Sequence, residues 1–209
     1  MTSADVVFIV DDDEAVRDSL EALLVAKGHR VDAYASGDEF LAAYRPDFRG
    51  CALVDLRMPG IDGIGVIERL KARGSKLPVV VVTGHGDVPL AVKAMKAGAI
   101  DFIEKPYNNQ TILDTVRQAL ARAGAASTTD AEAAKAAERL ALLTPREHEV
   151  LQQLVIGRPN KIIAYELKIS PRTVEIHRAN LMKKMEAGSL PHLVRLALAA
   201  GLGVGGEEP

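Results

Sequence analysis

The stretch Val6-Val7-Phe8-Ile9-Val10-Asp11-Asp12-Asp13 decides the fold, because five apolar residues end abruptly in three carboxylates. Three later apolar runs, residues 51–54, 79–82 and 100–104, also stop at a polar residue. Short β-branched runs that alternate with amphipathic stretches are typical of a parallel α/β sheet, which binds ligands beyond the carboxyl ends of its strands. We therefore expect five polar side chains at one edge of the sheet: Asp11, Asp12, Asp55, Thr83 and Lys105.

The order of these patterns predicts a first domain over residues 1–123 with an α/β fold, a five-stranded doubly wound parallel sheet. Apolar residues at helical spacing, caps and glycine stops predict helices between and after the strands. The expected strands cover residues 6–10, 30–34, 50–54, 79–82 and 100–104. The expected helices cover residues 14–27, 36–44, 63–73, 88–97 and 109–123.

A second, smaller all-α domain is expected over residues 140–209, after a linker at 124–139. The linker is rich in Ala, Ser and Thr without an apolar stripe, which favours an exposed connector, although its alanines also permit helix. Helices are then expected from Thr144 to Gly157, over 160–167, over 171–185 and over 189–200. A short helix, a tight turn and a longer helix follow the four-helix, helix-turn-helix plan.

The composition limits the class of protein. The chain has 209 residues, 48% of them hydrophobic, and no apolar stretch approaches the roughly 20 residues of a membrane span. We therefore expect a cytoplasmic protein without a membrane partner. Cys51 is the single cysteine, which excludes an internal disulfide. Residues 142–200 hold 9 basic and 5 acidic residues, an excess of positive charge that weakly favours a polyanion partner.

The acidic residues predict a phosphoryl-transfer site. Carboxylates held together resist ionisation unless a divalent cation shares their charge, and oxygen ligands favour Mg²⁺ or Mn²⁺. Asp11, Asp12 and Asp55 would supply that pocket. Asp55 is then the nucleophile toward a phosphoryl donor, Lys105 balances phosphate charge, and Thr83 donates a hydrogen bond. Singly, each residue is more often a turn, a cap or a solvated side chain, but the combination favours a site.

Two other functions are compatible with an acidic pocket. A metal-dependent phosphatase or phosphotransferase also forms an aspartyl phosphate, but such enzymes usually carry a second acid two residues after the nucleophile, where this chain has Arg57. We therefore expect no enzyme. An adaptor with a vestigial pocket is disfavoured because the set of polar residues is complete.

The helix expected over residues 171–185 is the candidate DNA-recognition helix, because its two faces differ. Val174, Leu181 and Met185 can pack inward. In helix-turn-helix proteins the second helix enters the major groove, and neighbouring groups hold phosphates. The candidate DNA contacts are Lys161, Arg172, Thr173, Glu175, Ile176, Arg178, Ala179, Lys183 and Lys184.

Residues 5–122 resemble the receiver domains of two-component response regulators. The motifs are Val10-Asp11-Asp12-Asp13, Asp55 to Gly60, Thr83-Gly84-His85-Gly86 and Glu104-Lys105-Pro106. The resemblance implies that Asp55 is the phosphoacceptor and that Asp12, Asp55 and the Arg57 carbonyl bind Mg²⁺, with Asp11 acting through the shell of the metal. It also implies a cis Lys105-Pro106 bond and an aromatic switch at Phe102, which could equally be a core residue.

Residues 140–202 resemble the LuxR/NarL output domain, through Leu143 to Glu147, Asn160 to Ala164 and Ser170 to Arg178. Together the two parts are similar to response regulators of the FixJ type. That resemblance implies a FixL-like haem oxygen-sensing histidine kinase, promoter DNA and RNA polymerase as partners, and activation of nitrogen-fixation and microaerobic genes. We expect phosphorylation to produce a homodimer. A repressor, or a regulator of an unrelated operon, remains open.

Overall fold

The structure, a computed structural model, describes residues 5–84, 88–123 and 129–202, without the side chains of Val88 and residues 129–132. His85, Gly86 and the first part of the predicted linker, 124–128, lie outside the described residues. By its contacts the chain divides into two units, residues 1–87 with 97–126 and residues 88–96 with 127–209. Among the described residues, no helix is both long and apolar enough to cross a membrane.

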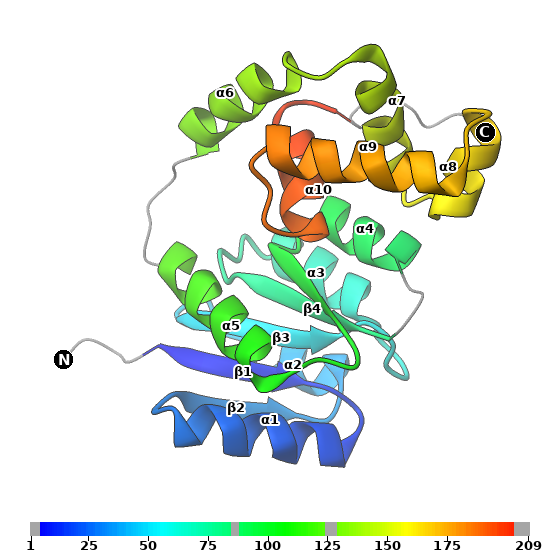
Figure 1. Cartoon of the computed structure of the whole chain (residues 1–209). Coiled ribbons are helices and arrows are strands. Elements are labelled where there is room, and N and C mark those ends of the chain that lie inside the picture. Colours follow the sequence, from blue (N-terminus) through cyan, green and yellow to red (C-terminus); the bar gives the residue numbers. More distant parts are fainter. Residues whose placement is uncertain (1–4, 85–87, 124–128, 203–209) are drawn as a thin grey trace. The chain divides into compact units, whose positions relative to one another are not determined.

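The first unit is built on a parallel five-stranded sheet with strand order β2-β1-β3-β4-β5, shown in Figure 1. Every strand pair is parallel, which confirms the predicted doubly wound fold. β1 and β3 lie next to each other, with Val10 opposite Val54, so the carboxylates that follow these strands leave the same edge. The strands are β1 (Val6–Val10), β2 (Arg30–Tyr34), β3 (Gly50–Asp55), β4 (Val79–Thr83) and β5 (Asp101–Glu104).

Helices cover both faces of this sheet, because alternate strand residues point to opposite faces. On one face, Leu24 of α1 and Val116 of α5 pack in one core with Val7, Leu53 and Val80. On the other face, the ring of Phe8 lies 5.9 Å from that of Phe40 in α2. The helices of this unit are α1 (Glu14–Ala26), α2 (Gly37–Ala43), α3 (Gly63–Ala72) and α5 (Asn109–Ala123).

The helix boundaries follow from the caps that the sequence supplies. Asp13 caps α1 by accepting hydrogen bonds from the amides of Ala15 and Val16, and Ser36 caps α2 through the amide of Glu39. Gly28 adopts a φ of +85° after α1, where a left-handed residue closes the helix. Cys51 is fully buried in β3, as expected for a small apolar residue, and burial raises the pKa of its thiol to about 12.

The second unit contains the four predicted helices, α7 (Pro145–Val155), α8 (Asn160–Glu166), α9 (Pro171–Lys184) and α10 (Leu190–Ala199), together with residues 88–96 of α4 (Val88–Ala97). Thr144 and Glu147 form the predicted capping box at the start of α7. Val174, Leu181 and Met185 of the predicted inward face are fully buried. A compact helical core therefore presents α8 and α9 as a helix-turn-helix.

A further helix, α6 (Thr129–Leu140), occupies most of the segment expected to be a connector. It packs against α10, and Ala136 is fully buried in the same core as Val150 and Leu193. The alanines of this segment permit helix, but an exposed segment was expected because alanine does not register as an apolar stripe. A methyl side chain is nevertheless enough where two helices approach closely.

Gly50 provides a test of the register between β1 and β3. Its φ is +124°, and a Cβ atom there would lie 1.8 Å from the carbonyl oxygen of Val6. We expect Gly50→Ala to lower the free energy of unfolding of the first unit by about 4 kcal/mol or more, because strand β1 must move. Urea unfolding followed by circular dichroism measures this loss.

Gly74→Ala is the matched control, since Gly74 has a φ of +69° but no atom lies within 4 Å of the position that a Cβ atom would take. It should cost only the backbone strain of about 1–2 kcal/mol. Equal losses for the two variants would contradict the close approach of the strands at Gly50.

Candidate functional site

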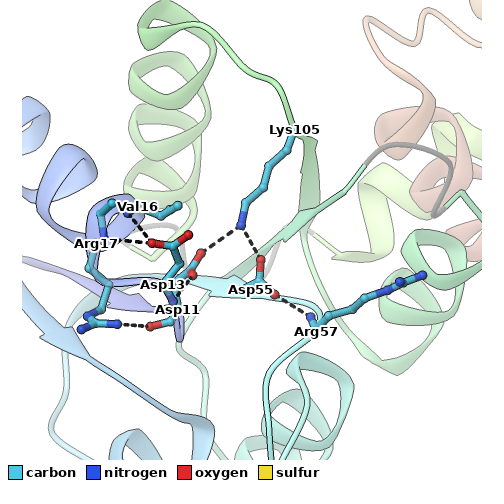
Figure 2. Close-up of polar contacts among 8 residues, drawn as sticks. Asp11, Asp13, Val16, Arg17, Asp55, Arg57 and Lys105 are labelled. Atoms are coloured by element: carbon cyan, nitrogen blue, oxygen red, sulfur yellow. Dashed lines mark hydrogen bonds and ion pairs between the residues drawn. The ribbon is translucent and has the colours of Figure 1, made fainter.

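Lys105 joins the ends of three strands. Its Nζ lies 2.6 Å from Oδ1 of Asp55 and 3.1 Å from Oδ2 of Asp11, as Figure 2 shows. Its backbone amide donates a hydrogen bond to the carbonyl of Thr83 at 2.7 Å. Asp11, Asp55 and Thr83 are all buried, with 3%, 7% and 2% of their surfaces exposed. Four residues from four separate segments therefore meet at the carboxyl edge of the sheet.

The second oxygen of Asp55 is also occupied. Its Oδ2 accepts a hydrogen bond of 2.6 Å from the backbone amide of Arg57, two residues further along. Asp11 is held similarly, because its Oδ1 accepts from the amide of Asp13 at 3.0 Å. Each carboxylate is thus fixed by one backbone amide and by the shared ammonium of Lys105, so both have a defined orientation.

The electrostatics of this group reflect burial opposed by ion pairing. Burial raises the pKa of Asp55 above its ordinary value, and the neighbouring charge of Asp11 adds to this, while Lys105 and the Arg57 amide lower it. Burial alone would lower the pKa of Lys105, but the hydrogen bonds and charges of Asp55 and Asp11 outweigh it and the pKa is raised. Two buried negative charges therefore share the positive charge of Lys105, whose side chain is 29% exposed.

The remaining predicted residues lie around this centre. The Thr83 hydroxyl donates to the carbonyl of Gly84 at 3.4 Å, and Phe102 is half-buried on β5, which leaves both of its interpretations open. Asp12 and Arg57 are exposed. The Lys105-Pro106 bond is cis, as the resemblance implied.

Hard divalent cations prefer oxygen ligands. Asp11 and Asp55 supply carboxylate oxygens of this type, which here contact the ammonium of Lys105. These oxygens do not form a complete set of metal ligands. Among the described residues, no three acidic, histidine or cysteine side chains lie close enough together to hold a metal ion. The structure thus brings together Asp11 and Asp55, while Asp12 lies on the exposed side of the loop.

Two residues of the site were not predicted from the sequence. Arg17 donates from Nη1 to the carbonyl of Asp11 at 2.8 Å, which ties the start of α1 to the acidic loop (Figure 2). Tyr107 is half-buried, and burial raises the pKa of its phenol; Lys105 lowers that pKa, whereas Asp11 and Asp55 raise it further. The only signal for either was its short distance along the chain from a predicted site residue.

The predicted DNA-reading face of α9 is exposed in its outer part. Arg172, Glu175, Ala179 and Lys183 are exposed, and Ile176 keeps 54% of its surface open to solvent. Lys161 is exposed on α8. An isoleucine and basic side chains on one open helical face suit contact with thymine methyl groups, base edges and phosphates.

Three other predicted contacts are engaged within the unit. Arg178 is half-buried and donates from Nη1 to Oδ1 of Asn160 in α8 at 2.7 Å, and burial lowers the pKa of its guanidinium. Lys184 pairs with the buried carboxylate of Glu147 at 2.7 Å. Thr173 bonds through its amide and its hydroxyl to Ser170, the cap of α9. The sequence placed these polar residues on α9 but could not show which partners they have in the fold.

Comparison with known families accounts for both parts of the chain. Residues 7–143 match the response regulator receiver domain, and residues 141–197 match the bacterial regulatory proteins of the luxR family. The chain belongs to the FixJ-type response regulators. It is therefore a phosphorylatable regulator with a DNA-binding domain.

Relatives cover nearly the whole chain. It is 50% identical to the transcriptional regulatory protein FixJ of Azorhizobium caulinodans over 94% of this chain and 93% of that protein. It is also 50% identical to FixJ of Rhizobium meliloti, over 94% of this chain and 97% of that one. Among solved structures, full-length FixJ from B. japonicum is 46% identical and matches with a TM-score of 0.57, covering 96% of this chain and 98% of that one.

Lys105 also generates a prediction about charge. Replacing it by methionine removes the positive charge that favours the ionised form of Asp55, so we expect the pKa of Asp55 to rise further above its ordinary value. A pH titration of the carboxyl ¹³C signals of aspartate measures the shift. Lys71→Met, an exposed lysine on α3, is the control and should leave the Asp55 signal unchanged. A lower pKa in Lys105→Met would contradict the bridge.

Proposed function

We propose that this chain accepts a phosphoryl group from a sensor histidine kinase on Asp55, then dimerises and binds promoter DNA. The observation that carries the proposal is the placement of Asp55, a buried carboxylate held by Lys105 and by the Arg57 amide at the carboxyl edge of the sheet. The proposed domains are residues 1–123 and 140–209, and the segment 124–139 predicted as a linker contains most of α6, which packs against α10.

The transfer requires one bond to form and one to break. A carboxylate oxygen of Asp55 attacks the phosphorus of phosphohistidine, the P–N bond breaks, and its electron pair leaves with the imidazole. Lys105, already 2.6 Å from Asp55, is close enough to turn its ammonium toward the added phosphoryl oxygens. The product is an acyl phosphate on a fixed side chain.

A divalent cation, Mg²⁺ or Mn²⁺, would be held at this edge by Asp11, Asp12, Asp55 and the backbone carbonyl of Arg57. When bound, such an ion offsets the negative charge of the acidic residues and of the phosphoryl group. Around it, the protein contributes the fixed orientation of Asp11 and Asp55 and the ammonium of Lys105.

The phosphoryl group changes the residues at the ends of β4 and β5. It adds negative charge and acceptor oxygens, toward which the Thr83 hydroxyl can turn from its weak bond of 3.4 Å to the Gly84 carbonyl. Phe102, half-buried on β5, then follows as the switch residue. We propose that the altered surface joins two copies of the chain, which places two α9 helices on one duplex.

The proposed targets follow from the relatives. Two transcriptional regulatory proteins named FixJ are 50% identical to this chain over more than nine tenths of their length, and the proposed targets are those that the FixJ-type resemblance implies, nitrogen-fixation and microaerobic genes. The kinase would be a FixL-like haem oxygen sensor, and RNA polymerase the partner at the promoter. We place the chain in the cytoplasm because its proposed DNA target lies in that compartment. The proposed DNA contacts are the exposed residues Lys161, Arg172, Glu175, Ile176 and Lys183.

A phosphatase is disfavoured by the residue two positions after Asp55. Arg57 has an exposed side chain, and it offers no acid to protonate a leaving group. The chain also ends in a domain of the luxR family, which suits a transcriptional regulator.

We expect Asp55→Asn to abolish phosphorylation because the amide is not a nucleophile. The full-length chain is incubated with Mg²⁺ and acetyl phosphate, and intact-mass spectrometry detects the added phosphoryl group. Asp47→Asn, which changes an exposed aspartate in the α2–β3 loop, is the control and should be phosphorylated normally. Retained phosphorylation of Asp55→Asn would assign the acceptor to another carboxylate.

Arg172→Ala tests the second step. We propose that Arg172 contacts a DNA phosphate, so its loss should weaken binding of the phosphorylated chain to a nitrogen-fixation promoter and reduce the slope of log affinity against log salt by about 1. Fluorescence anisotropy at several salt concentrations measures both quantities. Lys76→Ala, in the first unit, should change neither, and an unchanged slope for Arg172→Ala removes this residue from the interface.

A further inference from the structure

The C-terminal end of α9 is bonded to α6. Nη1 of Arg139 donates a hydrogen bond to the backbone carbonyl of Met185 at 3.3 Å, and Nη2 forms an ion pair with the carboxylate of Glu186. Met185 is the C-cap of α9, and Glu186 follows it with a left-handed φ of 50°. The guanidinium of Arg139 therefore spans the two residues at which the proposed recognition helix ends.

Arginine is well suited to this position. The last carbonyls of a helix have no partner within the helix, and the helix dipole places partial negative charge there. A planar guanidinium can donate to a carbonyl and a carboxylate at once, which a lysine ammonium does with less defined geometry. The side chain of Arg139 is 26% exposed and so partly shielded from water, whereas that of Glu186 is 68% exposed, so water weakens the ion pair more than the bond to the Met185 carbonyl.

α6 is anchored, so the contact is not made by a loose end. Ala136 is fully buried in the core of the second unit, and Leu140 packs against the same core. The match to the luxR family begins only at residue 141, so this helix and Arg139 lie outside it. The fold therefore connects to α9 a helix that the luxR match does not contain and that falls within the receiver-domain match, residues 7–143.

A second contact holds the same end of α9 from another side. Lys184 pairs with Glu147 of α7 at 2.7 Å and donates to the carbonyl of Leu142 at 3.3 Å. Lys183, by contrast, is exposed and available to DNA. The last turn of α9 is thus fixed by two cation contacts, one from the α6 side and one from α7.

We propose that Arg139 is a positioning residue for DNA recognition: it sets the orientation of α9 and so the affinity for DNA without contacting DNA. This inference rests on the proposed function, because it requires that α9 enters the major groove. Through Arg139, α6 contacts the C-terminal end of α9 directly.

The test uses the full-length, phosphorylated chain and promoter DNA. Arg139→Gln should weaken binding about tenfold, because it removes a charge-assisted contact that fixes the helix. The slope of log affinity against log salt should stay at the wild-type value, since no phosphate contact is lost. Arg139→Lys, which keeps the charge, should recover part of the affinity.

Hydrogen exchange in the absence of DNA gives a second readout. The amides of Lys184, Met185, Glu186 and Ala187 should exchange faster in Arg139→Gln, while those at the start of α9 stay protected. Arg146→Gln is the matched control, because Arg146 also pairs with a glutamate, Glu149, but lies exposed on α7. It should leave affinity and exchange unchanged.

Each result separates this inference from the proposed function. If wild-type protein does not bind the promoter, the proposed function fails. If wild-type protein binds and folded Arg139→Gln binds equally well, the positioning role is wrong. If the variant instead reduces the salt slope by about 1, Arg139 contacts DNA directly and the inference is overturned.

Discussion

The fold places one ammonium between two buried carboxylates, and the proposed function depends on that arrangement. Lys105 reaches Asp55 and Asp11 from the end of β5, while β3 and β1 deliver the two carboxylates at neighbouring positions. Parallel strands make this possible because all their carboxyl ends open at one edge. Removing two charges from water is costly, so the group persists only because backbone amides and Lys105 offset the burial of both carboxylates. A phosphoryl group that arrives at Asp55 redistributes charge within a set of contacts that is already fixed.

Much of this could be predicted from the sequence because local rules and the overall fold agree. Apolar runs, the Asp13 and Ser36 caps and the stop at Gly28 each specify one boundary, and the alternation of strands and helices then follows. The carboxylate edge was also predictable, since it requires only that strands be parallel. Its inner geometry was not, because the contact of Arg17 with the Asp11 carbonyl depends on how α1 begins relative to β1.

The DNA-binding part was predicted less completely, for a physical reason. A helical pattern tells which residues face the core, but not which polar side chains find partners at its border. Arg178 and Lys184 were predicted as DNA contacts, yet Asn160 and Glu147 engage them inside the unit. α6 was expected to be exposed because its packing uses alanine, whose burial leaves no strong apolar signal. Contacts between segments far apart in the sequence determine the partners and the burial of such side chains, and a single sequence does not reveal these contacts.

The position of the acyl phosphate tests the central claim most directly. The phosphorylated chain is treated with borohydride, which reduces an aspartyl phosphate to homoserine, and peptide mass spectrometry then identifies the modified residue. The account predicts homoserine at position 55, with Asp11, Asp12 and Asp13 unmodified. Homoserine at position 11 or 12, with Asp55 intact, would contradict it.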